Sequence, residues 1–139
     1  MLIRTKGHPK YEMFPKVAST VFAVGDAVTF NGSGQVAPAV AATTTGIVGI
    51  CKKAVAATDS DYAANTPIAI DVNLSADSEF EIDANGTVTA AMVGLYKDII
   101  TNAGTMAIAA ATNNHFIVTG LGSTTTKARV RVNLQSMVA

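Results

Sequence analysis

Two histidines and one cysteine are the side chains that could ligate a transition metal or act as base and nucleophile. His8 lies near the start of the chain, Cys51 lies between Ile50 and Lys52, and His115 begins the apolar run HFIV. Zinc sites combine His and Cys at short spacings such as H-E-x-x-H, and no such spacing is present. A catalytic triad can assemble from distant residues, but the position of Cys51 in a predicted strand favours a small core residue over an activated nucleophile.

Four carboxylates alternate along one segment of the chain, Asp77, Glu79, Glu81 and Asp83. The D-x-[DN]-x-[DN]-G calcium loop is absent, and carboxylates that alternate on a strand form a solvated or partner-facing row. Paired catalytic carboxylates need a fixed separation across a cleft, which a single strand does not provide. The glycine pairs lack the Lys and Ser or Thr ending of a phosphate-binding loop. The sequence therefore predicts a protein that is not an enzyme, with no catalytic, cofactor-binding or metal-binding residue.

Length and composition restrict the class of protein further. The chain has 139 residues, of which 49% are hydrophobic and 14% charged, and its formal net charge is zero. This length suits one domain, and the charge balance excludes a strongly basic nucleic-acid binder. No apolar run is long enough for a membrane span, and charges stand where a secretion signal would be apolar. A surface with so few charged residues is suited to burial against partner subunits. The alternative is a compact β-protein whose surface is polar but uncharged.

The zero net charge hides a strong segregation of charge along the chain. The first 16 residues contain four basic residues and one acidic residue. Residues 54–98 contain eight acidic residues and one lysine, and the charged residues after position 98 are Lys127, Arg129 and Arg131. These basic and acidic segments either meet within one molecule or pair between copies, or they form unrelated solvated faces.

The residues after position 16 have the periodicity and turns of a β-protein. Apolar residues alternate with polar ones in Pro67–Leu74, Ser78–Asp83 and Ala128–Leu134. Further strands are expected at Ala27–Phe30, Gln35–Ala39 and Ile47–Ile50. Short strands separated by Gly and Asn turns predict a mainly-β fold, a small β-barrel or sandwich.

Two turns and one helical alternative complete this prediction. Asn31-Gly-Ser-Gly34 predicts a hairpin turn, and Asn85-Gly86 predicts a second hairpin whose returning strand is Thr87–Val93. Apolar residues in Ala90–Ile100 also fall at helical spacing, so the prediction allows at most one short helix there.

The first 16 residues are predicted to form an extended N-terminal arm. Pro9 and Pro15 oppose a helix, yet Tyr11, Met13 and Phe14 are too apolar for a free tail. An arm that docks these side chains satisfies both observations, either on its own domain or on a neighbour. Residues 17–139 are then expected to form a single β domain.

Within residues 17–139 the chain resembles itself at an offset of 72 positions. Asp26-Ala-Val-Thr aligns with Asp98-Ile-Ile-Thr, and Ile47–Ile50 aligns with Val118–Leu121 after one gap. This approximate internal repeat predicts two similar β-units within the domain.

The runs VGDAVTFNGSGQVAPA, TTTGIVGICKKAV and VGLYKDIITNAGTMAIAAATNNHFIVTGL resemble the small capsid decoration, or cement, proteins of tailed bacteriophages. The resemblance implies a β-tulip-like domain with an N-terminal arm. It also implies a homo-oligomer, with a trimer favoured, that binds the major capsid protein on the outer surface of an assembled head and stabilises it. Such a protein is made in the cytoplasm of the host bacterium, and it binds neither nucleic acid nor membrane.

On this hypothesis the contacts with the capsid or with other subunits come from the arm. Tyr11, Met13 and Phe14 would enter apolar grooves, while Arg4, Lys6 and Lys10 would meet acidic surface. The alternative hypothesis is a phage tail or fibre domain that recognises a host surface or glycan. A small β-barrel enzyme is a third class, which a polar pocket holding His115 or Cys51 beside a carboxylate would indicate.

Overall fold

The computed structural model describes residues 1–100, 102–109 and 111–134, and in this part the chain is mainly β. No helix there is long and apolar enough to cross a membrane. In chain order the elements are β1 (Ile3–Lys6), β2 (Tyr11–Pro15), β3 (Ala27–Phe30), β4 (Val36–Pro38), β5 (Gly49–Cys51), β6 (Pro67–Asp71), β7 (Glu79–Ala84), the short 3-10 helix η1 (Ala90–Met92), β8 (Tyr96–Lys97), β9 (Thr105–Met106), β10 (Phe116–Leu121) and β11 (Lys127–Val132).

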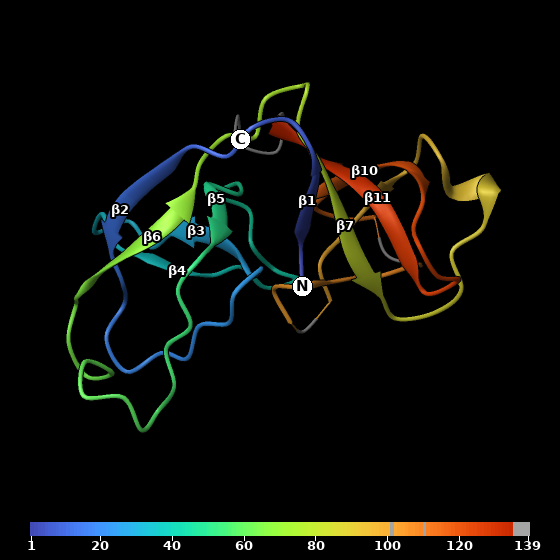
Figure 1. Ribbon diagram of the computed structural model, residues 1–139. Helices are drawn as coiled ribbons and strands as arrows, with labels where there is room; N and C mark the ends of the chain where they lie inside the picture. Colours follow the sequence, from blue (N-terminus) through green and yellow to red (C-terminus); the bar gives the residue numbers. More distant parts are fainter. Residues whose placement is uncertain (101, 110, 135–139) are drawn as a thin grey trace.

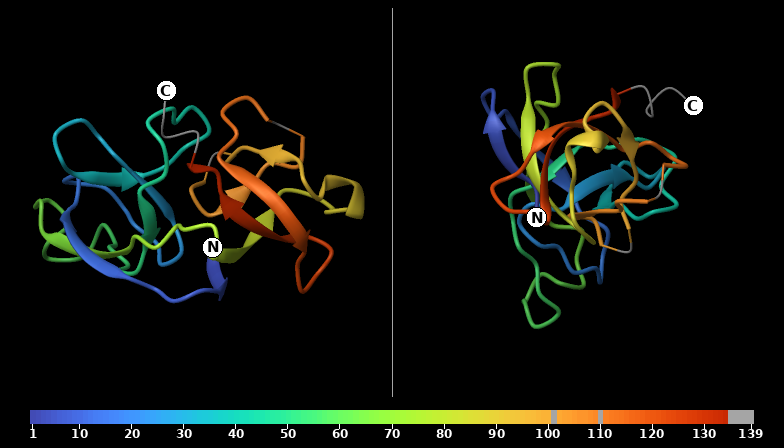
Figure 2. Two further views of the ribbon diagram at one scale, coloured as in Figure 1. Left: turned by 90° about the horizontal axis from the view of Figure 1, so that it is seen from above. Right: turned by 90° about the vertical axis from the view of Figure 1, so that its right-hand side faces the viewer.

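The strands form two sheets that pack side by side (Figures 1 and 2). Sheet I has the order β1-β7-β11-β10-β8, with β9 added in parallel beside β7. Sheet II has the order β2-β6-β5-β3-β4, and its neighbouring strands are all antiparallel. The predicted mainly-β fold is therefore confirmed, as a small sandwich. The described strands form no closed barrel, although an isolated bridge between Lys16 and Val36 joins the two edges of sheet II at one point.

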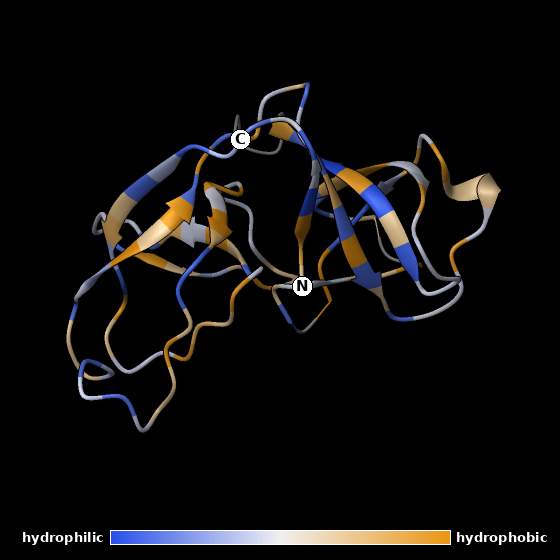
Figure 3. Cartoon of the chain, in the orientation of Figure 1, coloured by the Kyte–Doolittle hydropathy of each residue, from blue (hydrophilic) through white to orange (hydrophobic). Residues whose placement is uncertain are grey.

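The alternating segments of the sequence become the strands with one buried face. In β7, Phe80 and Ile82 are buried while Glu79 and Glu81 are partly exposed, and β11 buries Val130 in the same way. Hydrophobic and hydrophilic residues alternate along both strands (Figure 3). Because successive side chains on a strand point to opposite faces, each hydrophobic set lies on the core side of sheet I.

Two apolar cores result from the same alternation in sheet II. Ala27 in β3 and Ile50 in β5 join the core that lies against sheet I. Their neighbours Val28 and Cys51 face the other way, into a second core that includes Phe22. The inner strands β3 and β5 are therefore covered on both faces, which explains why they are apolar without alternating.

The turn at Asn31–Gly34 joins β3 to β4 as predicted. Gly32 and Gly34 have φ angles of +87° and +77°, which glycine adopts at low cost. The Asn31 side chain accepts hydrogen bonds from the backbone N–H groups of Ser33 and Gln35, at 2.9 and 3.2 Å. This network closes the hairpin.

The predicted hairpin at Asn85-Gly86 is wrong. The neighbours of β7 are β1, β11 and β9, and no strand returns after Gly86. Asn85 Oδ1 instead accepts the Ile108 N–H at 2.9 Å, and Gly86 lies against the Ile108 side chain. Tertiary contact with a distant segment therefore overrides the local turn signal. Of the helical alternative at Ala90–Ile100, the structure has only η1, and the chain then continues as β8.

Residues 1–16 are extended, but they belong to the sheets and do not form a separate arm. β1 is an edge strand of sheet I and β2 an edge strand of sheet II. Leu2 is buried in the core between the sheets, and Phe14 packs edge-on against Phe30 with ring centroids 5.3 Å apart. The segment therefore docks on its own domain, because its apolar residues complete both cores.

The two sheets repeat one strand order, which is consistent with an internal repeat. The succession β2-β6-β5-β3 in sheet II corresponds to β7-β11-β10-β8 in sheet I, with antiparallel neighbours throughout. The sequence repeat at an offset of 72 positions aligns β5 with β10, and the strand order matches the same two strands. It matches β3 with residues 99–102, however, whereas the topology matches β3 with β8.

Candidate contact surface

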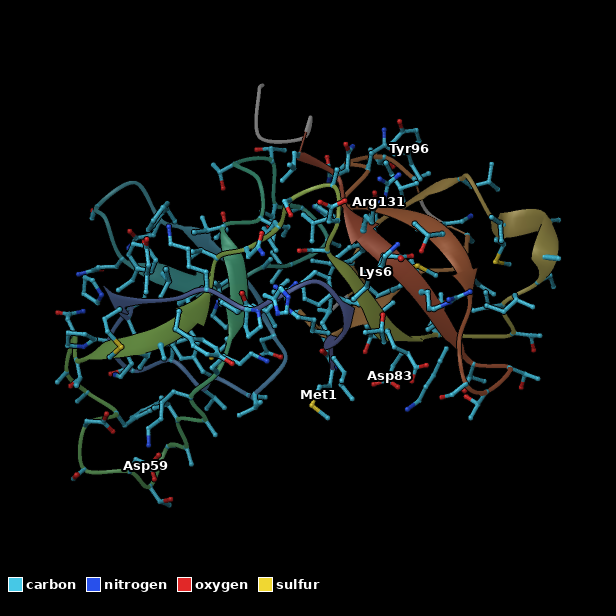
Figure 4. All side chains as sticks on the ribbon, turned by 45° about the horizontal axis from the view of Figure 1, so that its top comes forward. Met1, Lys6, Asp59, Asp83, Tyr96 and Arg131 are labelled. Carbon is cyan, nitrogen blue, oxygen red and sulfur yellow. The ribbon has the colours of Figure 1, made fainter. Side chains whose placement is uncertain are left out.

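The segregated charges of the sequence meet within one molecule, on the solvent face of sheet I. Strand order places the acidic residues of β7 between the basic residues of β1 and those of β11. Lys6 Nζ lies 3.7 Å from Glu79, and Lys127 Nζ lies 3.8 Å from both Glu81 and Asp83. The amino group of Met1 is 2.8 Å from Asp83, and these two residues lie next to each other in Figure 4. Each exposed ion pair contributes at most about 1 kcal/mol to the stability of the fold. These pairs therefore favour the observed alignment of the neighbouring strands more than they stabilise the protein.

Hydrogen bonds keep these carboxylates ionised. The Thr119 hydroxyl donates to Glu79 at 2.6 Å and lowers the pKa of Glu79. Ser123 donates its N–H and its hydroxyl to Glu81, at 2.8 and 2.9 Å, which lowers the pKa of Glu81. The Met1 ammonium group lowers the pKa of Asp83. Donors that favour the charged form explain all three directions.

Of the six residues predicted to make contacts, Arg4 and Phe14 are used inside the molecule. The Arg4 guanidinium binds the fully buried Asp71 of β6 at 2.8 Å and keeps only 10% of its side chain exposed. It also donates to Ser78 Oγ and lies over the Phe80 ring. Phe14 packs on the second core. These two side chains position β1 and β2, and we no longer assign them to an outside partner.

The other four predicted residues are exposed. Tyr11 and Met13 keep 58% and 62% of their surface on β2, and the Lys6 and Lys10 side chains extend into solvent. The structure therefore brings Lys10, Tyr11 and Met13 together along one sheet edge, while Lys6 belongs to the charged face of sheet I.

β2 also presents unpaired backbone groups. Val72 N–H donates to Lys10 C=O at 2.8 Å, and Lys16 N–H donates to Thr66 C=O at 3.3 Å, so the even-numbered residues of the strand face β6. In an antiparallel ladder the alternate residues then direct N–H and C=O away from the partner strand. Tyr11 and Met13 are these residues. β4 meets this edge at the Lys16–Val36 bridge, and within the described ranges no strand pairs with it beside Tyr11 or Met13.

Lys16 is a buried residue that the sequence groups with the basic residues of the first 16 positions. Its side chain is fully buried, and Nζ donates to the carbonyl oxygens of Asp61 at 2.8 Å, Tyr62 at 3.1 Å and Ala64 at 2.5 Å. It thereby fixes the long loop between β5 and β6 beneath sheet II. A lysine at the end of a basic segment carries no sequence signal for this role.

His115 and Cys51 lie in the interior. His115 Nδ1 accepts the Ile99 N–H at 3.0 Å, so Nε2 carries the proton and donates to Thr43 C=O at 2.8 Å. Cys51 is a small core residue, as predicted, and burial raises the pKa of its thiol. A raised pKa disfavours the reactive thiolate.

Two surface hollows lie away from His115 and Cys51. A hollow of about 210 Å³ lies beside Tyr96 and Arg131, and one of about 270 Å³ lies between Val21 and Val40. Neither is lined by His115 or Cys51. Within the described part of the chain, no three His, Cys, Asp or Glu side chains form a group suited to a metal ion.

The chain matches no protein-family model, and no curated protein matches it.

Proposed function

We propose that this chain is a structural protein of a tailed-phage virion that binds the outer surface of the assembled head and stabilises it. The resemblance to decoration proteins supports the class. The observation that carries the proposal is the exposed edge of β2, where Tyr11 and Met13 stand unburied beside unpaired backbone groups. Large apolar side chains on an unprotected sheet edge are suited to contact with another protein.

Binding would use a small number of side chains. Tyr11 offers a broad apolar ring with a polar end, and Met13 adapts to an irregular groove, so both suit a docking surface. Lys10 and Lys6 would meet acidic groups of the capsid protein and orient the approach. Because Arg4 and Phe14 hold β1 and β2 in place, the contact residues are already ordered before binding.

Self-association would multiply the effect of a weak contact. The resemblance favours a trimer, in which one bound subunit holds the others near their sites at high effective concentration. A protein that binds the mature shell and not its disassembled subunits stabilises the shell by mass action.

Co-sedimentation with purified heads tests the proposal. Removal of residues 1–16 is unsuitable, since it removes an edge strand from each sheet. We would compare the wild type with the double variant Tyr11→Ser/Met13→Ser. The control is Val93→Ser/Leu95→Ser, because these residues are exposed and their segment lies beside β10 of sheet I. Thermal unfolding confirms that each variant is folded.

The proposal expects binding by the wild type and the control, and at least a tenfold loss for the β2 variant. Equal binding by all three proteins would remove β2 from the mechanism. Failure of every protein to bind heads, with binding to host cells or their glycans, would instead favour a tail or fibre domain.

A further inference from the structure

We propose that β2 joins two copies of this chain by edge-to-edge strand pairing, in the register that places Tyr11 opposite Tyr11 of the second copy. This twofold contact covers the same edge that the proposed capsid contact uses, so it belongs to the free protein and gives way to the capsid on the head. It does not require a phage head, so its test is independent of capsid binding. It also differs from a threefold contact, because each subunit of a trimer would still present its own β2.

The backbone geometry restricts how two β2 edges can pair. The groups that face outwards belong to Tyr11 and Met13, and hydrogen-bonded pairs form only between outward-facing residues. An antiparallel pair can then be centred on Tyr11, Glu12 or Met13. A centre at Met13 sets Tyr11 opposite Pro15 and Glu12 opposite Phe14, so that Lys10 and Glu12 of the two copies do not meet.

Charge separates the two remaining registers. A centre at Glu12 places the two Glu12 side chains directly opposite each other, and like charges in that position destabilise a strand pair. A centre at Tyr11 places Lys10 opposite Glu12 of the second copy, and Glu12 opposite Lys10. Both side chains are largely exposed, and they already approach each other within one chain at 3.7 Å. The register centred on Tyr11 is therefore self-complementary in charge.

This register also satisfies three of the four outward-facing backbone groups of Tyr11 and Met13, and the Met13 C=O stays open to water because Pro9 has no N–H. Tyr11 would exchange both of its backbone hydrogen bonds with Tyr11 of the second copy, and Met13 N–H would donate to Pro9 C=O. The Tyr11 rings would lie side by side with Met13 near them, which removes the most exposed apolar surface of β2 from water.

Cysteine substitutions measure the register directly. Residues that form a hydrogen-bonded antiparallel pair have Cα atoms about 5.5 Å apart, within the range that a disulfide bridges. Tyr11→Cys should form a disulfide-linked dimer under mild oxidation, whereas Glu12→Cys and Met13→Cys should remain monomeric on a non-reducing gel. The native Cys51 is buried and does not compete. A disulfide through position 12 or 13 but not through position 11, or through none of the three, overturns the proposal.

A charge swap provides a second measurement that keeps Tyr11. In the proposed register, Lys10→Glu or Glu12→Lys alone places like charges opposite each other, and the double variant restores opposite charges. Sedimentation over a dilution series should give the wild type and the double variant about twice the mass of either single variant at high concentration. A double variant as small as the single variants, or four proteins of equal mass, contradicts the contact.

Discussion

Arg4 in β1 and Asp71 in β6 form a buried ion pair that joins the two sheets, with Arg4 Nη2 2.8 Å from Asp71 Oδ2. Arg4 also donates to the backbone carbonyl of Asn73 at 2.7 Å, and the second oxygen of Asp71 accepts the Lys10 N–H at 3.1 Å. The pair therefore connects both N-terminal strands with the segment that crosses from sheet II to sheet I.

Removal of the Arg4 charge should destabilise the fold strongly. Arg4→Met leaves the Asp71 carboxylate buried without a cation, and the loss of one partner of a buried pair costs about 3–5 kcal/mol. Urea unfolding measures this change in the free energy of unfolding. Lys6→Met is the control, because the Lys6–Glu79 pair is exposed and its loss should cost less than about 1 kcal/mol. Similar losses for both variants would show that the Arg4 pair does not hold the sheets together.

Replacement of Lys16 should loosen the loop between β5 and β6. Lys16→Met keeps most of the apolar chain length but leaves the carbonyl groups of Asp61, Tyr62 and Ala64 without their donor. Unsatisfied buried polar groups cost about 1–3 kcal/mol. The loop should also be cleaved faster by a protease, which mass spectrometry of the fragments detects. Lys10→Met, on the exposed part of the same segment, should leave the cleavage rate unchanged, and unaltered cleavage in Lys16→Met would argue against this role.

The sequence was informative where one face of a strand is buried and the other is solvated. The alternation in β6, β7 and β11 and the glycine turn before β4 were predictable because they depend on neighbours in the chain. The partners of β1 and β2 were not, since adjacent segments of the chain enter different sheets and pair with strands more than 50 residues away.

The contact residues illustrate the same limit. Residue type alone suggested six contact residues. Arg4 is of the same type as Lys10, and Phe14 of the same type as Tyr11, so only the neighbours of each side chain in the fold distinguish the buried residues from the exposed ones. Asp71 supplies the buried carboxylate that takes up Arg4, and Phe30 supplies the ring that takes up Phe14. Neither partner is close in sequence.

Acidification should destabilise the protein through the carboxylates of β7. Glu79, Glu81 and Asp83 have lowered pKa values in the folded chain. Such groups stabilise the fold at a pH above their unfolded pKa, near 4, and this contribution is lost as the pH falls through the folded pKa. Asp26 has the opposite effect on stability: burial raises its pKa, so its ionised form destabilises the folded chain and protonation relieves this cost. The net expectation is a free energy of unfolding that is flat near neutrality and falls below about pH 4.

The Thr119 hydroxyl offers a direct test of the cause at Glu79. Thr119→Val removes the donor and keeps the side-chain shape, so the pKa of Glu79 should rise towards its ordinary value. An NMR titration of the Glu79 carboxyl carbon measures it. Thr119→Ser retains a hydroxyl and should leave the pKa low, and the Glu81 carboxyl is an internal reference. An unchanged pKa for Glu79 in Thr119→Val would assign the shift to the neighbouring cations instead.

Two glycines in strands should respond differently to the same substitution. A Cβ atom at Gly49 of β5 would lie 2.5 Å from the backbone oxygen of Asp71 and from Ile70 Cγ2. At Gly120 of β10 the three atoms nearest to an added Cβ all belong to the Arg129 side chain, with Nη2 at 2.5 Å. Neither glycine has a positive φ, so the two positions differ in the room available for a Cβ atom and not in backbone conformation.

The backbone of β6 cannot move without breaking its hydrogen bonds to the neighbouring strands, and Gly49→Ala should therefore cost about 1–3 kcal/mol or more. The Arg129 guanidinium can swing into solvent, so Gly120→Ala should change the free energy of unfolding by about 0.5 kcal/mol or less. Urea unfolding of both variants measures the contrast. If Gly120→Ala proves the more costly, Arg129 is held more firmly across β10 than β6 is held against β5.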